Sequence, residues 1–326
     1  MKTLILTQAE IPALLPMADM ISSMERAFRL LAAGDAELPL RSVQPLTGGR
    51  GWFAVMPAQL SGDFGLKAIA VMPANEGSAH DSHPGAVLLF DPTTGRLIGI
   101  MDASAITALR TAAVSGLATR LLARPGASEL ALIGAGTQAR THLLAMAAVR
   151  PLKDVRIWSR RILTVNAFVR WADGRWPITV CESARQAVAG ADIICTVTSS
   201  PTPVLEGAWL ARGAHVNAVG ASLRSSRELD TTAVERSTVF VDRAESALAE
   251  SGDLLTARDG NMWDGTMTEL ASVVTGAAPG RQSDEEITLF KSLGLAIEDL
   301  AAARALYERA RDTGAGTWID FGGFRE

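Results

Sequence analysis

The sequence predicts an α/β protein with two domains, a doubly wound parallel sheet and a smaller α+β domain that precedes it. The chain has 326 residues, 48% of them apolar and 20% charged, which is enough for two hydrophobic cores. Hairpin-like turn signals dominate up to about residue 122, and strands alternate with helical patterns after that. A glycine turn at 134–136 stands between an apolar run and a helical pattern. These three observations favour a parallel sheet with covering helices in the second part.

The first part of the chain reads as strands joined by glycine-containing turns, with a helix near each end. The apolar stripe of Met20, Met24 and Phe28 has helical spacing, and Gly34 can end that helix. Asp102 or Ser104 can cap the second helix. We expect a mostly antiparallel sheet, with strands at 3–6, 41–46, 52–56, 65–72, 86–90 and 96–101 and helices at 17–33 and 103–122.

From residue 129 the pattern is that of two mononucleotide-binding halves with six parallel strands. A last apolar stripe over 284–311 is expected to form one long helix that carries the chain back to the first domain. The predicted domains are therefore 1–122 with 300–326, and 123–299. The predicted strands are 129–133, 154–158, 178–181, 192–197, 214–219 and 238–241, and the helices 137–149, 162–171, 183–189, 229–235 and 244–250.

The glycine turn matches the small-residue form of the Rossmann dinucleotide fingerprint. Gly134 permits the tight turn, Gly136 lets the backbone approach a pyrophosphate, and Ala139 keeps helix and strand close. The amides at the start of the following helix then face the phosphates, where the helix dipole favours negative charge. The motif is weak alone, but here the preceding strand and the following helix are both present.

The end of the second parallel strand indicates which dinucleotide is bound. An NAD site usually has an acidic residue there, whereas this chain has Ser159, Arg160 and Arg161. A guanidinium offers several donors to the acceptor-only 2′-phosphate of NADP. We therefore expect NADPH, with NADH as the alternative. A solvated basic helix start is the structural alternative, although arginine is unfavourable at a helix N-terminus without an anion.

Composition argues against several other classes of protein. The net charge is −4 and there is no basic block, so we expect no nucleic-acid partner. The sequence has no charge-free run of 18 apolar residues, so we expect no membrane span. The apolar stretch at the N-terminus is too short for a signal peptide. Cys181 and Cys195 lie in apolar strand-like runs, so we expect buried reduced thiols and a cytoplasmic protein. The four histidines lack metal-ligand spacing, so no metal is expected.

Several segments together resemble the ornithine cyclodeaminase/mu-crystallin family over nearly the whole chain. They are Gly65-Leu-Lys67-Ala, Ser82-His-Pro-Gly through Asp91, Ile106-Thr-Ala-Leu-Arg110-Thr, Gly134-Ala-Gly-Thr-Gln-Ala139, Val216-Asn-Ala-Val-Gly220 and Phe290-Lys-Ser-Leu-Gly294. The resemblance implies a dinucleotide-binding domain plus a substrate domain that builds a homodimer interface. It also implies cyclodeaminases, ketimine reductases or amino-acid and opine-type dehydrogenases as candidate activities.

The resemblance carries over to individual positions. Arg41, Lys67 and Arg110 match positions that hold the substrate carboxylate, and we expect Lys67 and Arg110 to be catalytic. Ser159, Arg160 and Arg161 match the adenosine-ribose end. The other positions matched to the cofactor are Ser82, His83, Thr111, Gly134, Ala135, Gly136, Gln138, Thr196, Val197 and Ser222.

One departure favours the ketimine reductase branch, whose members include Δ1-pyrroline-2-carboxylate reductases. Cyclodeaminases carry an aspartate shortly after the Val-Gly motif, and Ser222 stands there in this chain. The expected reaction is reduction of Δ1-pyrroline-2-carboxylate or Δ1-piperideine-2-carboxylate to L-proline or L-pipecolate. Lys67 is the candidate for proton relay, because nearby arginines would lower its pKa. The alternatives are ornithine cyclodeamination, an amino-acid or opine-type dehydrogenase acting on an amino-acid substrate, and a non-enzymatic, NADPH-dependent small-ligand binding protein.

Overall fold

The computed structural model describes residues 2–75 and 78–322, and the chain divides into two compact units. The first unit comprises Met1–Thr111 and Gly294–Glu326, and the second comprises Ala112–Leu293. One change of unit falls inside helix α3 (Ala103–Leu122). The assignment of functions to 1–122 with 300–326 and to 123–299 stays a prediction, and residues 1, 76–77 and 323–326 of those ranges lie outside the described residues.

The first unit is built on an eight-stranded sheet in the order β16-β1-β7-β6-β5-β4-β2, with β3 paired to β4. All its strand pairs are antiparallel except β1 with β7, which confirms the predicted mostly antiparallel sheet. The strands are β1 (Thr3–Leu6), β2 (Ala36–Glu37), β3 (Ser42–Pro45), β4 (Trp52–Leu60), β5 (Asp63–Val71), β6 (Gly85–Phe90), β7 (Leu97–Asp102) and β16 (Thr317–Ile319).

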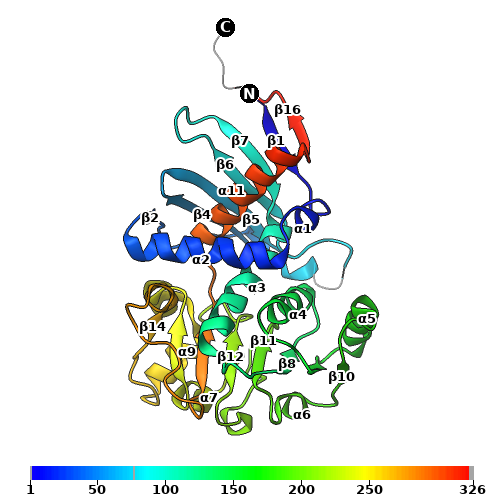
Figure 1. Cartoon of the computed structure of the whole chain (residues 1–326), viewed down its shortest axis with the longest axis vertical. Helices are drawn as coiled ribbons and strands as arrows, with labels where there is room; N and C mark the ends of the chain where they lie inside the picture. The colour runs from blue at the N-terminus through cyan, green and yellow to red at the C-terminus, as the bar shows by residue number, and fades with distance from the viewer. Residues whose placement is uncertain (1, 76–77, 323–326) are drawn as a thin grey trace. The chain divides into compact units, whose positions relative to one another are not determined.

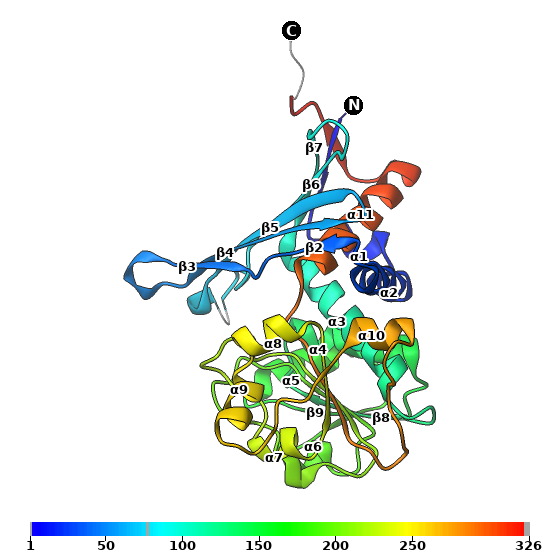
Figure 2. The same cartoon turned by 90° about the vertical axis from the view of Figure 1, so that its left-hand side faces the viewer.

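Helices cover one face of this sheet (Figures 1 and 2). Helix α11 (Ala296–Thr313) packs on β4, β5 and β6, and α2 (Met17–Ala33) packs on α11. The predicted stripe of Met20, Met24 and Phe28 is fully buried, and α2 ends at Gly34, whose φ of 81° is left-handed. A short helix, α1 (Ile11–Leu14), was not predicted because four residues show too little periodicity.

The second unit is an eight-stranded parallel sheet in the order β10-β9-β8-β11-β12-β15-β13-β14. Its first five positions have the doubly wound order, and the direction of winding reverses between β8 and β11. The strands are β8 (Glu129–Ile133), β9 (Asp154–Trp158), β10 (Ile178–Val180), β11 (Ile193–Thr196), β12 (His215–Ala218), β13 (Thr238–Val241), β14 (Thr268–Glu269) and β15 (Thr288–Lys291).

Alternate side chains of these strands enter the two faces of the sheet. Ala131 and Ile133 of β8 belong to a buried cluster that includes residues of α6, α7, α8 and α9. The helices are α4 (Thr137–Val149), α5 (Ile162–Ala172), α6 (Ala184–Val188), α7 (Thr231–Glu235), α8 (Ala244–Glu250), α9 (Gly252–Asp259) and α10 (Leu270–Thr275). Within the described ranges no helix is long and apolar enough to cross a membrane.

The prediction of one helix over 284–311 was wrong. Residues Thr288–Lys291 form β15, which lies between β12 and β13 and is buried on both faces. A strand that is buried on both faces reads as a continuous apolar run, and periodicity alone does not separate such a run from a helix. Gly294, with φ of 83°, then ends the extended segment, and α11 begins at Ala296.

Phe290→Ala tests the position of β15. Phe290 is fully buried in this strand, so the truncation should lower the free energy of unfolding by about 3–5 kcal/mol. Leu163→Ala, at a side chain that is 78% exposed, is the control and should cost less than about 0.5 kcal/mol. Urea denaturation measures both variants. Equal small losses would contradict the buried strand.

Candidate functional site

The glycine turn after β8 has the geometry of a dinucleotide-binding turn. Gly134 has φ of 115°, and a Cβ placed there would lie 2.7 Å from the carbonyl oxygen of Val197. A Cβ placed at Gly136 would meet nothing within 4 Å, so the backbone of Gly136 borders open space. Ala139 is fully buried, which lets α4 approach the sheet. The turn thus leaves room for a ligand beside Ala135 and Gly136.

The first turn of α4 fits the phosphates of such a ligand. Gly136 is the N-cap residue, and no side chain caps this helix end. Helix α4 has 13 residues, so its dipole is well formed. The side chain of Gln138, in this first turn, has a buried Oε1 without a hydrogen-bond partner among the described residues. The open amides suit phosphate oxygens, and the orphaned acceptor of Gln138 suits a donor of the same ligand, such as a ribose hydroxyl.

Ser159, Arg160 and Arg161 connect β9 to α5, as predicted. Both arginines are exposed, and Arg161 is the N-cap residue of α5. The first turn of α5 contains no acidic residue and no side-chain cap. Two guanidinium groups at a helix N-terminus whose first turn has no acidic residue favour an anion there. The residues therefore suit a 2′-phosphate better than they suit ribose hydroxyls alone.

The positions predicted to lie near the nicotinamide are at or after the ends of β11 and β12, on the other side of β8 from β9. They are Thr196, Val197 and Ser222. Thr196 ends β11 and is fully buried, and its hydroxyl donates to Glu228 at 2.8 Å. Val197 donates its amide to the carbonyl of Ile133 at 2.9 Å, and its side chain is half-buried. Ser222 is half-buried in the loop after β12.

A buried group of charges joins Lys67 and Arg110 in the first unit. Lys67 Nζ lies 2.7 Å from Asp299 Oδ2, and Arg110 Nε donates to Asp299 Oδ1 at 3.0 Å. Arg110 Nη1 donates to Glu298 at 2.6 Å. Lys67 is 2% exposed and Arg110 5% exposed. The structure therefore brings the two predicted catalytic residues onto a single carboxylate.

The carboxylates come from the first turn of α11, where the helix dipole favours negative charge. Lys67 projects from β5 on the side that α11 covers, and Arg110 comes from α3. Three segments far apart in sequence thus converge on one ion-pair network, which we call the Lys67 cluster (Lys67, Arg110, Glu298 and Asp299).

The Lys67 cluster sets the protonation of its lysine. Burial lowers the pKa of Lys67 to about 8, Asp299 opposes this shift, and the positive charges of Arg110 and Arg41 add to it. The arginines therefore act as expected, but burial is the larger cause. Burial acts to raise the pKa of Asp299, yet Arg110 and Lys67 hold it below its usual value. Asp299 is thus an anion beside a lysine that titrates near neutral pH.

The remaining predicted positions of the first unit lie on its loops and on α3. Arg41 donates from Nη2 to the carbonyl of Gly294 at 3.3 Å. Ser82 Oγ and His83 Nδ1 are hydrogen-bonded at 2.8 Å, and Ser104 donates to the carbonyl of His83. Burial lowers the pKa of His83, and the positive charge of Lys67 lowers it further. The negative charge of Asp81 opposes this shift. Thr111 is buried on α3.

Ser104 therefore positions the His83 loop, and the helix cap comes from Asp102, whose Oδ1 accepts from the amide of Ala105 at 2.8 Å.

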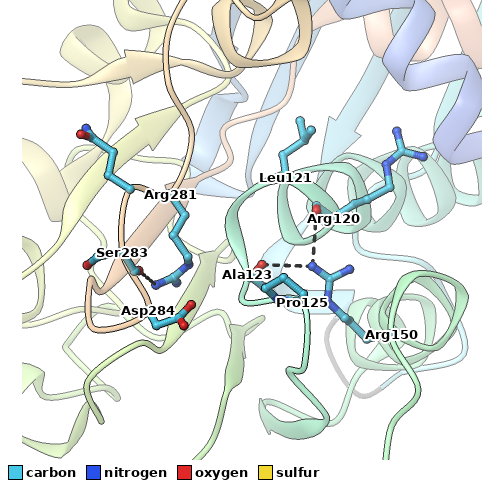
Figure 3. Close-up of a pocket in the computed structure, with 9 residues that line it drawn as sticks. Arg120, Leu121, Ala123, Pro125, Arg150, Arg281, Ser283 and Asp284 are labelled. Carbon is cyan, nitrogen blue, oxygen red and sulfur yellow. Dashed lines mark hydrogen bonds between the residues drawn. The ribbon is translucent and has the colours of Figure 1, made fainter.

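A cavity of about 680 Å³ lies elsewhere in the second unit, before β8 and before β15, at the amino edge of the parallel strands (Figure 3). Arg150 donates to the carbonyls of Thr119, Arg120 and Ala123, and so caps the end of α3. Arg281 donates to the carbonyl of Leu122. These arginines serve the fold. The cavity is lined by Arg120, Leu121, Ala123, Pro125, Arg150, Arg281, Gln282, Ser283 and Asp284.

Two cysteines and the histidine of α4 are buried outside these sites. Cys181 and Cys195 are buried free thiols, as predicted. Burial lowers the pKa of His142 to about 4, and its ring nitrogens are bonded to the Gln138 carbonyl and to Ser115. In residues 2–75 and 78–322, no group of three or more His, Cys, Asp or Glu side chains is arranged to hold a metal ion.

Comparison with known proteins agrees with this geometry. The profile of the Ornithine cyclodeaminase/mu-crystallin family matches residues 1–314. The chain belongs to this family. Mouse ketimine reductase mu-crystallin is 42% identical over 278 residues, which are 84% of this chain and 86% of the mouse protein. Alanine dehydrogenase of Archaeoglobus fulgidus is 35% identical over 98% of this chain and 99% of its own length.

A solved structure of this family has the same fold. It is Δ1-pyrroline-2-carboxylate reductase of Thermococcus litoralis, in complex with NADH and L-proline. Its TM-score is 0.94 at 36% identity, over 97% of this chain and 99% of that chain. The predicted fold class, a Rossmann-type parallel sheet plus an α+β domain, is confirmed.

The sequence analysis did not predict the buried carboxylates Glu298, Asp299 and Glu228. A lysine in an apolar strand signals a buried counter-ion, because an unpaired buried charge is too costly. Glu298 and Asp299 are adjacent in the sequence. The predicted helix began at residue 284, however, so these acids did not stand out as the first turn of α11. Glu228 gave no signal, because its run of polar neighbours is typical of a surface loop.

Asp299→Asn should lower the pKa of Lys67 further. The variant removes the negative charge that opposes burial, so less of the lysine is protonated at neutral pH. NMR titration of the 13Cε signal of Lys67 measures this pKa. Glu298→Gln is the matched control, because Glu298 is paired with Arg110 and should change the pKa much less. A higher pKa in Asp299→Asn, or equal shifts in both variants, would contradict the account.

Proposed function

We propose that the protein is an NADPH-dependent ketimine reductase that reduces Δ1-pyrroline-2-carboxylate or Δ1-piperideine-2-carboxylate to L-proline or L-pipecolate. Two relatives support this reaction, the mouse ketimine reductase and the Thermococcus litoralis reductase, whose structure contains NADH and L-proline. The observation that carries the proposal is the Lys67 cluster, which holds a buried lysine with a pKa of about 8 on an anionic carboxylate.

The Lys67 cluster can bind and protonate a small carboxylated imine. Bound NADPH would supply the hydride, held by Gly134, Ala135, Gly136 and Gln138 at its phosphates. The Arg41 guanidinium is half-exposed near Lys67 and suits the substrate carboxylate. Two donors of Arg110 are already engaged with Glu298 and Asp299, so its main effect is to fix the cluster.

Lys67 is the group that can move a proton in this cluster. At neutral pH its ammonium is mostly protonated, and a donor with a pKa near ambient pH is an efficient general acid. Protonation of the ring nitrogen makes the imine carbon electrophilic. Asp299 keeps the ammonium in place and favours its return to the charged form after turnover.

Purified protein should oxidise NADPH when either cyclic imine is added, and release no ammonia from ornithine. Lys67→Met keeps the length of the side chain and removes its proton, so kcat should fall about 100-fold or more. The wild-type rate should decline as the pH rises through about 8, because the ammonium is lost there. Absorbance at 340 nm measures both. An unchanged rate in Lys67→Met would refute the role of Lys67.

The preference for NADPH depends on the arginines after β9. Replacing Arg160 and Arg161 by Ala should raise KM for NADPH about 10- to 100-fold, the effect of losing one or two charge-assisted hydrogen bonds. KM for NADH should change less than about twofold. Arg170→Ala, at the other end of α5, is the control. Equal effects on the two cofactors would contradict a 2′-phosphate site.

Amino-acid dehydrogenation is the second candidate, favoured by the likeness to the Archaeoglobus fulgidus alanine dehydrogenase. Reduction of pyruvate with ammonium, at a kcat/KM above that for either cyclic imine, would support it. Cyclodeamination is less favoured, because Ser222 offers no carboxylate to the distal ammonium of ornithine.

We further propose that the protein is a homodimer. In this dimer the sheet of the first unit contacts the same sheet of the second copy through the face opposite α2 and α11. Among the described residues, the long helices α2 and α11 pack on one face of this sheet (Figure 2). The other face carries the stacked rings of Phe64 and Phe90, whose centroids are 5.4 Å apart, and the half-buried Leu66 and Leu88. Phe53 on the same face is 41% exposed. A contiguous exposed apolar patch is typical of a protein interface.

Leu88→Glu should convert the dimer to monomer, because burying a charge in an apolar interface is costly. Sedimentation velocity at micromolar concentration measures the change. Leu163→Glu, the same substitution on the exposed α5, should leave the dimer intact. A monomeric wild type, or an intact Leu88→Glu dimer, would contradict this interface.

A further inference from the structure

A single buried carboxylate ties together the loops that follow β11 and β12. Both oxygens of Glu228 accept two hydrogen bonds. Oε1 accepts from the amide and the hydroxyl of Thr198, at 2.6 and 2.7 Å. Oε2 accepts from the hydroxyl of Thr196 at 2.8 Å and from the amide of Gly220 at 2.6 Å. Glu228 is fully buried. Its four acceptor positions are therefore filled by donors from the last residue of β11 and from the loops after β11 and β12.

The loops are packed closely around this carboxylate. A Cβ at Gly220 would lie 2.0 Å from the carbonyl oxygen of Thr198 and 2.6 Å from Glu228 Oε1. Only glycine lets the second loop approach so near. The Thr198 hydroxyl in turn accepts from the amide of Ser200 at 3.1 Å, which extends the network along the first loop.

The backbone of Glu228 is held by a second buried carboxylate. Asp253 Oδ1 accepts from the amides of Glu228 and Leu229, at 2.8 and 2.9 Å. Its other oxygen lies 2.9 Å from Lys291 Nζ, and Asp253, Lys291 and Glu228 are all fully buried. Burial raises the pKa of Glu228, and the charge of Lys291 opposes that shift. Such a network fixes one geometry, because partial satisfaction of buried charges is costly.

Sheet topology indicates what these loops would contact. A dinucleotide lies across the carboxyl ends of the strands, at the point where the strand order reverses, here between β8 and β11. The residues suited to the adenosine half follow β9, on one side of β8. The other half of the ligand therefore extends toward the ends of β11 and β12 (Figure 1), where Glu228 makes its contacts.

We propose that Glu228 is a positioning residue, which fixes the loops after β11 and β12 in the shape that receives the nicotinamide half of the dinucleotide. The inference rests on the proposed use of NADPH but not on the identity of the imine. Glu228 acts through Thr198 and Gly220. Glutamine at this position has nearly the size of glutamate but would present an amide donor to groups that are themselves donors, so the hydrogen-bond network that fixes the loops would be lost.

Two ligands separate this role from a general loss of stability. Isothermal titration of the Glu228→Gln apoprotein should show NADPH binding weakened about tenfold, the effect of losing one or two hydrogen bonds. The fragment 2′-phospho-ADP-ribose, which lacks nicotinamide, should bind as it binds the wild type. Thr198→Val removes one donor from a half-buried residue and should give a smaller change of the same kind.

Asp192→Asn is the matched control. Asp192 accepts from the amides of Ser128 and Glu129 at the amino edge of the same sheet, at 2.8 and 3.1 Å. This variant should lose stability without changing the ratio of the two dissociation constants. Hydrogen exchange of the apoprotein should be faster at 197–200 and 220 in Glu228→Gln but not in Asp192→Asn.

An unchanged ratio of dissociation constants in both Glu228→Gln and Thr198→Val would overturn the positioning role. Failure of the wild type to bind either ligand is a different result, because it would overturn the proposed cofactor and the inference with it.

Discussion

The ion pair between Lys67 and Asp299 is the interaction on which the first unit depends. A lysine that points into the core of a strand-and-helix layer needs a carboxylate within contact distance, because burial otherwise removes its charge. The chain meets this need by returning from the second unit and starting α11 with Glu298 and Asp299. Arg110 pairs with both acids, so that two cations face two carboxylates in this cluster. The packing of β5, α3 and α11 buries Lys67 and lowers its pKa to about 8, and the contact with Asp299 opposes that shift.

The second unit uses buried charge in a similar way. Glu228 and Asp253 accept hydrogen bonds from backbone amides of loop residues, at Thr198 and Gly220 for Glu228 and at Glu228 itself for Asp253. Loops at the carboxyl ends of parallel strands form ligand sites in this class of fold, but they are intrinsically variable. A fully buried carboxylate with four donors gives them a single conformation. Both units therefore combine a generic scaffold with a few costly charges where chemistry is expected.

Much of the fold could be predicted, because its signals are local. The glycine turn at 134–136, the stripe of α2 and the alternation of strands with helices all follow from spacing within a short window. The strand at Thr288–Lys291 could not be separated from a helix, because a strand buried on both faces has no polar alternation. As a result, the expected helix over 284–311 hid the true start of α11.

The candidate site was predicted in part for the same reason. Lys67 and Arg110 were predicted from the family resemblance, and Lys67 also stands out as a charge in an apolar strand. The acidic partners of Arg110 lie 188 and 189 residues further along the chain. No local pattern links positions so distant. Glu228 could not be found at all, since four of its hydrogen bonds end on residues whose proximity only the tertiary structure reveals.

The most direct test of the central claim follows the hydrogen itself. The protein is incubated with Δ1-pyrroline-2-carboxylate and NADPH that carries deuterium at both C4 positions, and the product is analysed by 1H NMR and mass spectrometry. The account predicts proline with one deuterium, at C2. Proline without deuterium, or no proline while deuterated NADPH is bound, would contradict it.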